Sequence, residues 1–226
     1  MAGWTSPDRE KNIWDGTLVS NFQGTSKQTP NDEIDLVNKR YVDGLIHGAV
    51  ELFLTEDASD IGTYFDLATD STGNPEENTV TAITAGGTSL IASYASVLNE
   101  AVIESITDLE SGIYSMHIHA SADFPRGMTL YFEFYRRTSG GVETLLATSH
   151  DSNILSTSEA QIELHSTVTT DLIWNTGDRV VVKIYGRNTN AASKNITIYI
   201  EGDTLSRVEF PAFIPPSAAG TPAGSD

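Results

Sequence analysis

The chain has 226 residues, and its 13 Lys and Arg against 31 Asp and Glu give a formal net charge of -18. This charge opposes binding to nucleic acid and to anionic membranes, because both are polyanions. There is no cysteine, so disulfides and thiolate metal sites are excluded, and packing or assembly must stabilise the fold. We expect neither a secretory signal nor membrane insertion, since no apolar run approaches the roughly 20 residues that span a bilayer.

Residues 1–28 are polar, with large apolar side chains at no steady period. Such a segment is either a disordered leader or a docking arm whose aromatic side chains insert into a partner surface. We favour an extended anchoring arm that binds other proteins through Trp4, Trp14 and Phe22.

Residues 29–50 predict a short helix, with Thr29 as N-cap and Pro30 at the first helical position. Apolar side chains then follow at steps of three and four: Ile34, Val37, Tyr41 and Leu45. A helix of about 15 residues is marginal alone in water, so this stripe must be buried. It packs either on its own domain or against copies of itself, as the neck of a short trimeric coil.

Residues 51–210 change to a period of two with turn residues between the runs, which is typical of half-buried antiparallel strands. Alternation is clearest in four segments: 112–122, 128–138, 177–187 and 195–202. Weaker strand candidates are 51–55, 63–69, 78–84, 143–149 and 160–168, while 96–105 fits a strand or a short helix.

The apolar sides of the four clearest segments predict a core between two sheets: Tyr114, Met116, Ile118, Ala120, Met128, Leu130, Phe132, Phe134, Val180, Val182, Ile184, Ile196, Ile198 and Ile200. About eight to ten strands without a long helix predict an all-β fold, a jelly-roll β-sandwich head. The arm and one short helix precede this head. The Pro/Ala/Gly-rich tail, residues 211–226, cannot build a core.

The segment "DLVNKRYVDGL", residues 35–45, resembles a short element of tailed-bacteriophage fibre proteins that occurs near the start of a fibre or before a distal domain. The resemblance covers about ten residues. It implies a virion protein, and the absence of a long repetitive shaft favours a short fibre, collar or head/tail appendage over an elongated tail fibre.

A second resemblance is one of pattern. "SGIYSMHIHAS", followed much later by "LIWNTGDRVVVKIYG" and "NITIYIEG", resembles the strand order of tumour-necrosis-factor-like and complement-type globular heads. In that family three jelly rolls assemble around an axis. Together the two resemblances imply a phage virion homotrimer with an anchoring arm, a helical neck and a jelly-roll head.

Familiar catalytic motifs are absent: there is no Gly-rich phosphate loop with Lys, no G-x-S-x-G elbow and no H-E-x-x-H. The scattered carboxylates give no reason to select a glycosidase pair, whose spacing is spatial. We therefore expect a protein that is not an enzyme and has no cofactor.

Two stretches contain candidate metal ligands. His117 and His119 share a face of one strand and could chelate a transition metal, although ordinary polar residues explain them as well. The acidic stretch with Asp66, Asp70, Asn74, Glu76 and Glu77 lacks EF-hand spacing and fits an acidic turn better than a calcium site. We expect no metal.

The polar sides of the strands contain more aromatic residues than a solvated face requires: Tyr131, Tyr135, Tyr185 and Tyr199. Exposed aromatic side chains are typical of protein interfaces and of sugar-stacking surfaces. Subunit contact is favoured, because a trimer needs an interface. Two functions remain open: a structural virion component, and a virion protein that binds a host-surface glycan.

Overall fold

The computed structural model describes residues 47–203 and 205–215. The predicted anchor and neck residues lie outside these ranges: Trp4, Trp14, Phe22, Ile34, Val37, Tyr41 and Leu45. Within the part of the chain that is described, no helix is long and apolar enough to cross a bilayer.

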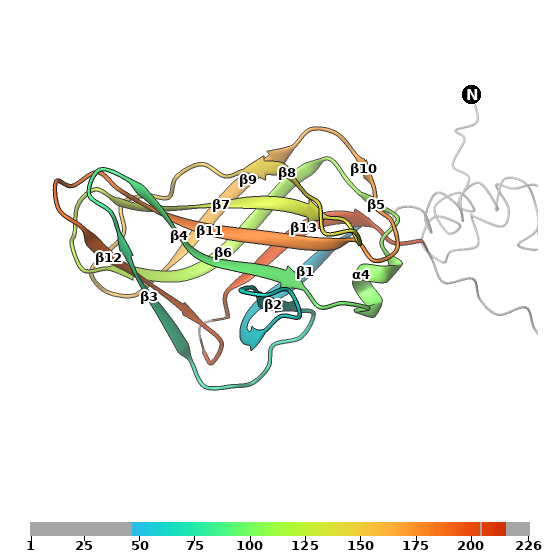
Figure 1. Cartoon of the computed structure of the whole chain (residues 1–226), viewed down its shortest axis with the longest axis horizontal. Helices are drawn as coiled ribbons and strands as arrows, with labels where there is room; N and C mark the ends of the chain where they lie inside the picture. Colours follow the sequence, from blue (N-terminus) through green and yellow to red (C-terminus); the bar gives the residue numbers. More distant parts are fainter. Residues whose placement is uncertain (1–46, 204, 216–226) are drawn as a thin grey trace, which may run out of the picture. The chain divides into compact units, whose positions relative to one another are not determined.

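The described residues form thirteen strands and one short helix (Figure 1). In chain order they are β1 (His47–Ala58), β2 (Phe65–Ala68), β3 (Glu77–Ile83), β4 (Thr88–Ser96), α4 (Ala101–Ser105), β5 (Asp108–Leu109), β6 (Gly112–Ala122), β7 (Met128–Arg137), β8 (Glu143–Thr148), β9 (Ala160–Val168), β10 (Leu172–Ile173), β11 (Arg179–Asn188), β12 (Lys194–Ile200) and β13 (Arg207–Phe213). The prediction of an all-β fold is confirmed.

The strands form one hydrogen-bonded sheet in the order β3-β12-β6-β13-β1-β2-β4-β11-β7-β8, with β9 paired to β6. The sheet folds over, so that the strands around β6 pack on the strands around β7 and the two layers form a sandwich. The sequence predicted two separate sheets. In the structure they are continuous, because β2 pairs with β1 on one side and, in parallel, with β4 on the other.

Alternating apolar residues fill the space between the two layers. Every core residue predicted from the four clearest segments is 0% exposed. Tyr114 of β6 contacts Phe134 of β7 edge to face at 4.8 Å between ring centroids, and Phe134 also contacts Phe210 of β13 at 5.3 Å. Each such side chain contributes roughly 1.5–3 kcal/mol by leaving water, so this core stabilises the sandwich.

Four strands were missing from the sequence-based prediction: the two-residue strands β5 and β10, and the longer β4 and β13. The small residues of β4 do not alternate cleanly, since residues 92–96 are all buried. The predicted head ended at residue 210, whereas β13 runs to Phe213 and contains Pro211, which has no N–H to donate to a ladder. Its carbonyl oxygen still accepts a hydrogen bond from the Glu110 N–H at 3.2 Å. The ambiguous stretch 96–105 contains the short helix α4.

The described chain enters and leaves the sandwich at one end. β1 begins at His47, four residues before the predicted start of the head, and His47 pairs with Phe213, the last residue of β13. The turns between β3 and β4, β6 and β7, and β11 and β12 lie at the opposite end, on the left of Figure 1. The sandwich therefore has one end where β1 starts and β13 ends, and an opposite, distal end.

Candidate interaction surface

Three of the four predicted surface tyrosines lie together on the outer side of β7 and β11. Tyr131 is the register partner of Tyr185, and the two rings stack at 5.0 Å with an interplanar angle of 8°. Arg187 lies over the Tyr131 ring at 5.3 Å. Tyr135 lies on the same side of β7 and donates a 2.5 Å hydrogen bond to Glu133. We call Tyr131, Glu133, Tyr135, Lys183 and Tyr185 the tyrosine face.

The fourth tyrosine is elsewhere. Tyr199 belongs to β12, where it is the register partner of His119 on β6. Its hydroxyl oxygen lies 3.0 Å from the Ser121 hydroxyl. Because β12 and β6 belong to the other layer, Tyr199 is not part of the tyrosine face.

An ion-pair network crosses the tyrosine face. The Lys183 ammonium lies 2.7 Å from Glu143 Oε2, and Arg137 donates a 3.0 Å hydrogen bond to Glu143 Oε1. Tyr64, from the loop between β1 and β2, donates to the same oxygen at 2.8 Å. Lys183 also lies 4.6 Å from the centre of the Tyr135 ring. The network holds this loop against the sheet.

Burial and these hydrogen-bond partners shift the pKa values of Glu143 and Lys183. Desolvation raises the pKa of Glu143, but hydrogen bonds from Lys183 and Tyr64 outweigh it and leave the pKa below its ordinary value. Desolvation lowers the pKa of Lys183, and its hydrogen bonds to Glu143 and Tyr64 outweigh it, so the net pKa is raised. Desolvation and the hydrogen bond to Glu133 raise the pKa of Tyr135. The pair is therefore charged at neutral pH.

Apolar side chains flank the tyrosine face on the neighbouring strands. Leu90 on β4 is opposite Tyr185, and Leu145 on β8 is opposite Tyr135. Both leucines are 48% exposed, whereas the three tyrosines are half-buried. The sequence prediction missed Lys183, Glu143 and the leucines because only the strand order brings them to the tyrosines.

A polar cleft of about 280 Å³ adjoins this surface, and Arg137 and Arg179 line it. The buried Arg179 donates to the Ser96 carbonyl oxygen at 2.6 Å and to the Ser59 hydroxyl at 3.1 Å, and it pairs with Asp60. Since its guanidinium already has three partners, Arg179 fixes the loop after β1 to the sheet.

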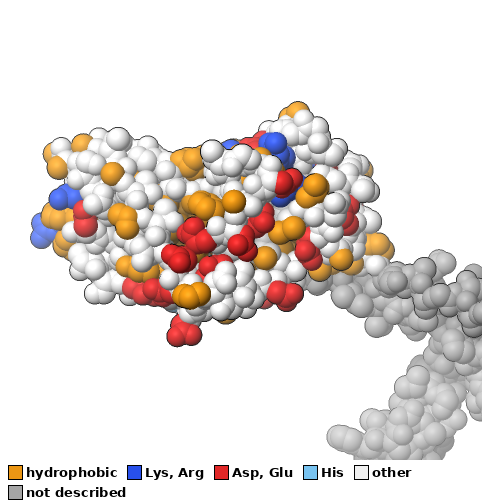
Figure 2. Space-filling view, turned by 60° about the horizontal axis from the view of Figure 1, so that its bottom comes forward, with side chains coloured by type: hydrophobic (Ala, Val, Ile, Leu, Met, Phe, Trp, Pro, Cys, Tyr) orange, Lys and Arg blue, Asp and Glu red, His pale blue; other side chains and the backbone are white. Residues whose placement is uncertain are grey.

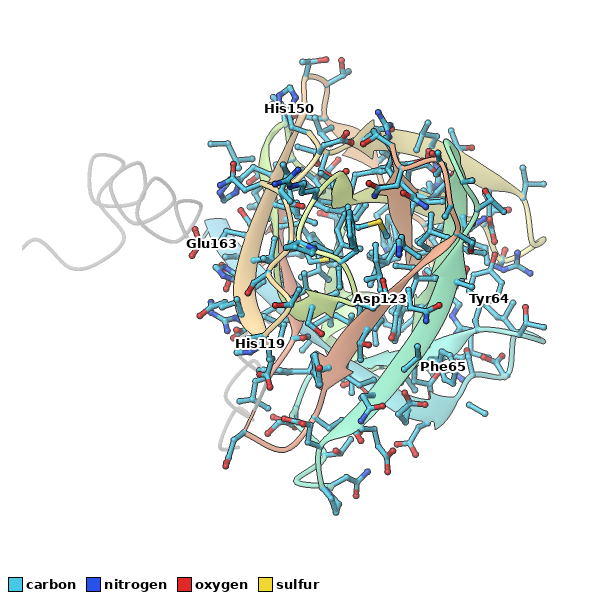
Figure 3. The ribbon with its side chains drawn as sticks, turned by 90° about the vertical axis from the view of Figure 1, so that its left-hand side faces the viewer. Tyr64, Phe65, His119, Asp123, His150 and Glu163 are labelled. Carbon is cyan, nitrogen blue, oxygen red and sulfur yellow. The ribbon has the colours of Figure 1, made fainter. Side chains whose placement is uncertain are left out.

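The histidine pair lies on the opposite side of the sandwich from Tyr64, as Figure 3 shows for His119 and Glu163. His117 Nδ1 is 3.6 Å from Glu163, and His119 Nδ1 is 2.9 Å from Glu159. Residues 47–203 and 205–215 contain no group of three or more His, Asp or Glu side chains that could hold a metal ion.

The acidic stretch with the weak calcium candidates divides between two strands and a loop. Asp66 lies in β2, where its backbone carbonyl accepts a 3.0 Å hydrogen bond from Thr55, and Glu77 begins β3. Between them, Asn74 Nδ2 lies 3.4 Å from Glu201. These residues therefore lie in different elements of the fold.

No protein-family model matches the chain, and no curated protein matches it. Solved structures share its fold. A CocE/NonD family hydrolase from Staphylococcus aureus is 11% identical over 74% of this chain, with a TM-score of 0.52. An aminopeptidase from a Thaumarchaeota archaeon is 7% identical over 74%, also at 0.52. An α-amino acid ester hydrolase is 12% identical over 73%, at 0.50.

This chain spans only 36%, 37% and 36% of those three chains, in the same order. Weaker likenesses carry no argument about this chain. A structure of infectious bursal disease virus Gx strain is 13% identical over 74% of this chain and 42% of its own, with a TM-score of 0.32. Eiger TNF from S. frugiperda is 10% identical over 79% and 98%, with a TM-score of 0.29.

The fold comparison corrects one prediction. The chain was expected not to be an enzyme, yet solved structures that share its sandwich at a TM-score of 0.5 or above include two hydrolases and an aminopeptidase. That expectation is wrong. It rested on the absence of familiar catalytic motifs, and this absence does not distinguish the sandwich from the folds of enzymes. At these identities the likeness shows the fold alone.

Proposed function

We propose that the chain is a structural protein of a tailed-phage virion, a short fibre, collar or head/tail appendage that projects a homotrimeric β-sandwich head. The resemblance of residues 35–45 to phage fibre elements supports the virion assignment. The observation that carries the assembly is the tyrosine face with its exposed leucines, Leu90 and Leu145.

The tyrosine face has the composition of a subunit contact. Tyrosine and arginine are enriched among the residues that dominate binding energy, and such residues cluster where a partner excludes water. In each copy Tyr131, Tyr135 and Tyr185 are held by stacking and hydrogen bonds. Little side-chain entropy would therefore be lost on association, and burying Leu90 and Leu145 would add apolar area.

The course of the chain supports a projecting head. The register pair His47 and Phe213 puts the start of β1 and the end of β13 at one end of the sandwich, and in this proposal the opposite, distal end projects from the particle. In this proposal residues 1–28 attach the protein to the particle, and residues 29–46, which precede β1, form the neck of the trimer.

A deletion variant tests the attachment. Removing residues 1–28 leaves β1 to β13 intact, so we expect a β-rich protein that no longer joins purified particles. The measurement is the amount of the chain per particle, compared between full-length and deleted protein. Normal incorporation of the deleted protein would exclude residues 1–28 as the anchor.

Hydrolysis is a second candidate function, and the observation that favours it is a contact between a serine and a histidine. Ser115 Oγ lies 3.0 Å from His165 Nδ1 on β6 and β9, and Ser115 borders a hollow of about 400 Å³. A hydroxyl next to an imidazole is an element of nucleophilic catalysis. Hydrolysis of p-nitrophenyl acetate that is lost in Ser115→Ala would support this candidate, and a rate equal to that of buffer would exclude it for this ester.

A further inference from the structure

Three turns form the distal end of the sandwich: 84–87, 123–127 and 189–193. We call them the distal tip (Figure 1). Hydrogen bonds connect all three. Asn190 Nδ2 donates to the Arg126 carbonyl at 2.8 Å, and the Asn190 carbonyl accepts from the Gly86 N–H at 2.9 Å. The distal tip is therefore one connected surface rather than three independent loops.

Two further residues fix this surface. The buried Asn188 donates from Nδ2 to the carbonyls of Ile83 and Ala192, and its Oδ1 accepts from the Asn190 N–H at 2.8 Å. Gly127 has a φ of +64°, and a Cβ there would lie 2.3 Å from Thr189 Oγ1. Close packing and buried hydrogen bonds hold the distal tip in one conformation, which lowers the entropy cost of binding a ligand.

The basic residues of the described ranges divide into two groups. Six form an ion pair with a carboxylate: Arg136, Arg137, Arg179, Lys183, Arg187 and Arg207. The other two, Arg126 and Lys194, form none within residues 47–203 and 205–215. Arg126 lies in the distal tip, and Lys194 directly follows its third turn as the first residue of β12. Among the residues that the structure describes, these are the cations left available to an external anion.

An aromatic ring accompanies the two cations. Lys194 Nζ lies 4.5 Å from the centre of the half-buried Phe124 ring, and the exposed Arg126 follows two residues later in the same turn. Figure 2 shows basic and hydrophobic side chains together at this end, while acidic side chains occupy the middle of that face. The exposed Asp123, near the centre of the end view in Figure 3, is the opposing charge in this turn.

We propose that the distal tip binds an anionic polysaccharide, with Arg126 and Lys194 contacting its charged groups and Phe124 its sugar ring. Thr189, Ser193 and Asn195 are exposed beside them and offer hydrogen bonds to sugar hydroxyls. Two cations on an acidic chain do not provide the many phosphate contacts of a nucleic-acid site. A polysaccharide fits better than a membrane, because the exposed Thr189, Ser193 and Asn195 would lose their hydrogen bonds to water in an apolar layer.

Retention of the full chain on immobilised dextran sulfate, compared with uncharged dextran, tests this site. We expect binding to dextran sulfate alone. The double variant Arg126→Gln/Lys194→Gln should weaken it by about tenfold or more, since each cation supplies a charge-assisted contact. The control is Arg187→Gln, which removes one positive charge, where the double variant removes two, from an exposed pair with Asp151 outside the distal tip. The control should bind as the unchanged chain does.

Three outcomes would overturn the site: equal retention on both matrices, full binding by the double variant, or equal weakening by Arg187→Gln. Binding to phosphatidylglycerol vesicles that depends on Arg126 and Lys194, without binding to dextran sulfate, would also overturn it in favour of a membrane. The inference is independent of the virion assignment. Loss of trimer mass would count against the proposed assembly, whereas the dextran comparison tests the distal tip.

Discussion

Lys183 of β11 and Glu143 of β8 lie 2.7 Å apart across the intervening strand β7. Their side chains are only 18% and 17% exposed, so water screens the pair poorly. Tyr64 and Arg137 bind the same carboxylate, which connects the loop after β1 to three strands. The pair thus stabilises the layer that presents the tyrosine face.

We predict that Glu143→Gln lowers the free energy of unfolding by about 1–3 kcal/mol, because it leaves a half-buried Lys183 without its carboxylate. Urea unfolding followed by circular dichroism measures the change. Arg187→Gln is the control, since its exposed pair with Asp151 should contribute less than about 1 kcal/mol. A loss no larger than that of the control would refute a stabilising role for the pair.

The stabilising effect of Glu143 should depend on pH. Its pKa is lower in the folded chain than in the unfolded chain, so the stabilisation is present above the unfolded pKa of about 4.3 and is lost as pH falls through the folded pKa. The pKa of Lys183 is raised in the folded chain, so its contribution to stability depends on pH in the opposite direction. This stabilisation is present below about pH 10.4 and is lost as pH rises through the folded pKa. The difference in unfolding free energy between the unchanged chain and Glu143→Gln should therefore be largest between these limits. A difference that grows below pH 4 would contradict this assignment.

Gly186 of β11 allows the two layers to approach closely. A Cβ there would lie 2.7 Å from Ile83 Cδ1 and 2.8 Å from Ile196 Cδ1. We expect Gly186→Ala to destabilise the fold by about 1–3 kcal/mol through overpacking. Gly140→Ala is the control, because its Cβ would meet only Thr138 Oγ1 at 3.8 Å. Equal melting temperatures for the two variants would show that the core repacks without cost.

The exposed Leu90 allows the proposed subunit contact to be disrupted without changing the core. Leu90→Glu puts a charge beside Tyr185, so we expect the trimer to separate into folded monomers. Val80→Glu is the control, since Val80 is 60% exposed on β3, away from the tyrosine face. Circular dichroism verifies the fold and light scattering gives the mass. A Leu90→Glu protein that keeps the trimer mass would exclude this face as the contact.

The sequence predicted the parts of the fold that depend on local pattern. Alternation at Met128, Leu130, Phe132 and Phe134 follows from the period of a strand whose one side is buried, and the structure confirms it. Strand order depends on distant pairing, which no local pattern contains. The stack of Tyr131 on Tyr185 and the separation of Tyr199 from both were for this reason not predictable.

The basic distal tip was missed for a similar reason. Arg126 and Lys194 are 68 positions apart in the sequence, and neither belongs to a run of positive charge. The pairing of β12 with β6 and the hydrogen bonds among the turns bring them to one surface. Their lack of carboxylate partners within the described residues depends on the whole fold, so composition alone could not reveal it.

Light scattering on the full-length chain at micromolar concentration tests the central claim, that the chain assembles as a trimer through the tyrosine face. We expect a single species with three times the chain mass of 24.4 kDa. A species at 24.4 kDa, or a stable dimer, would contradict it.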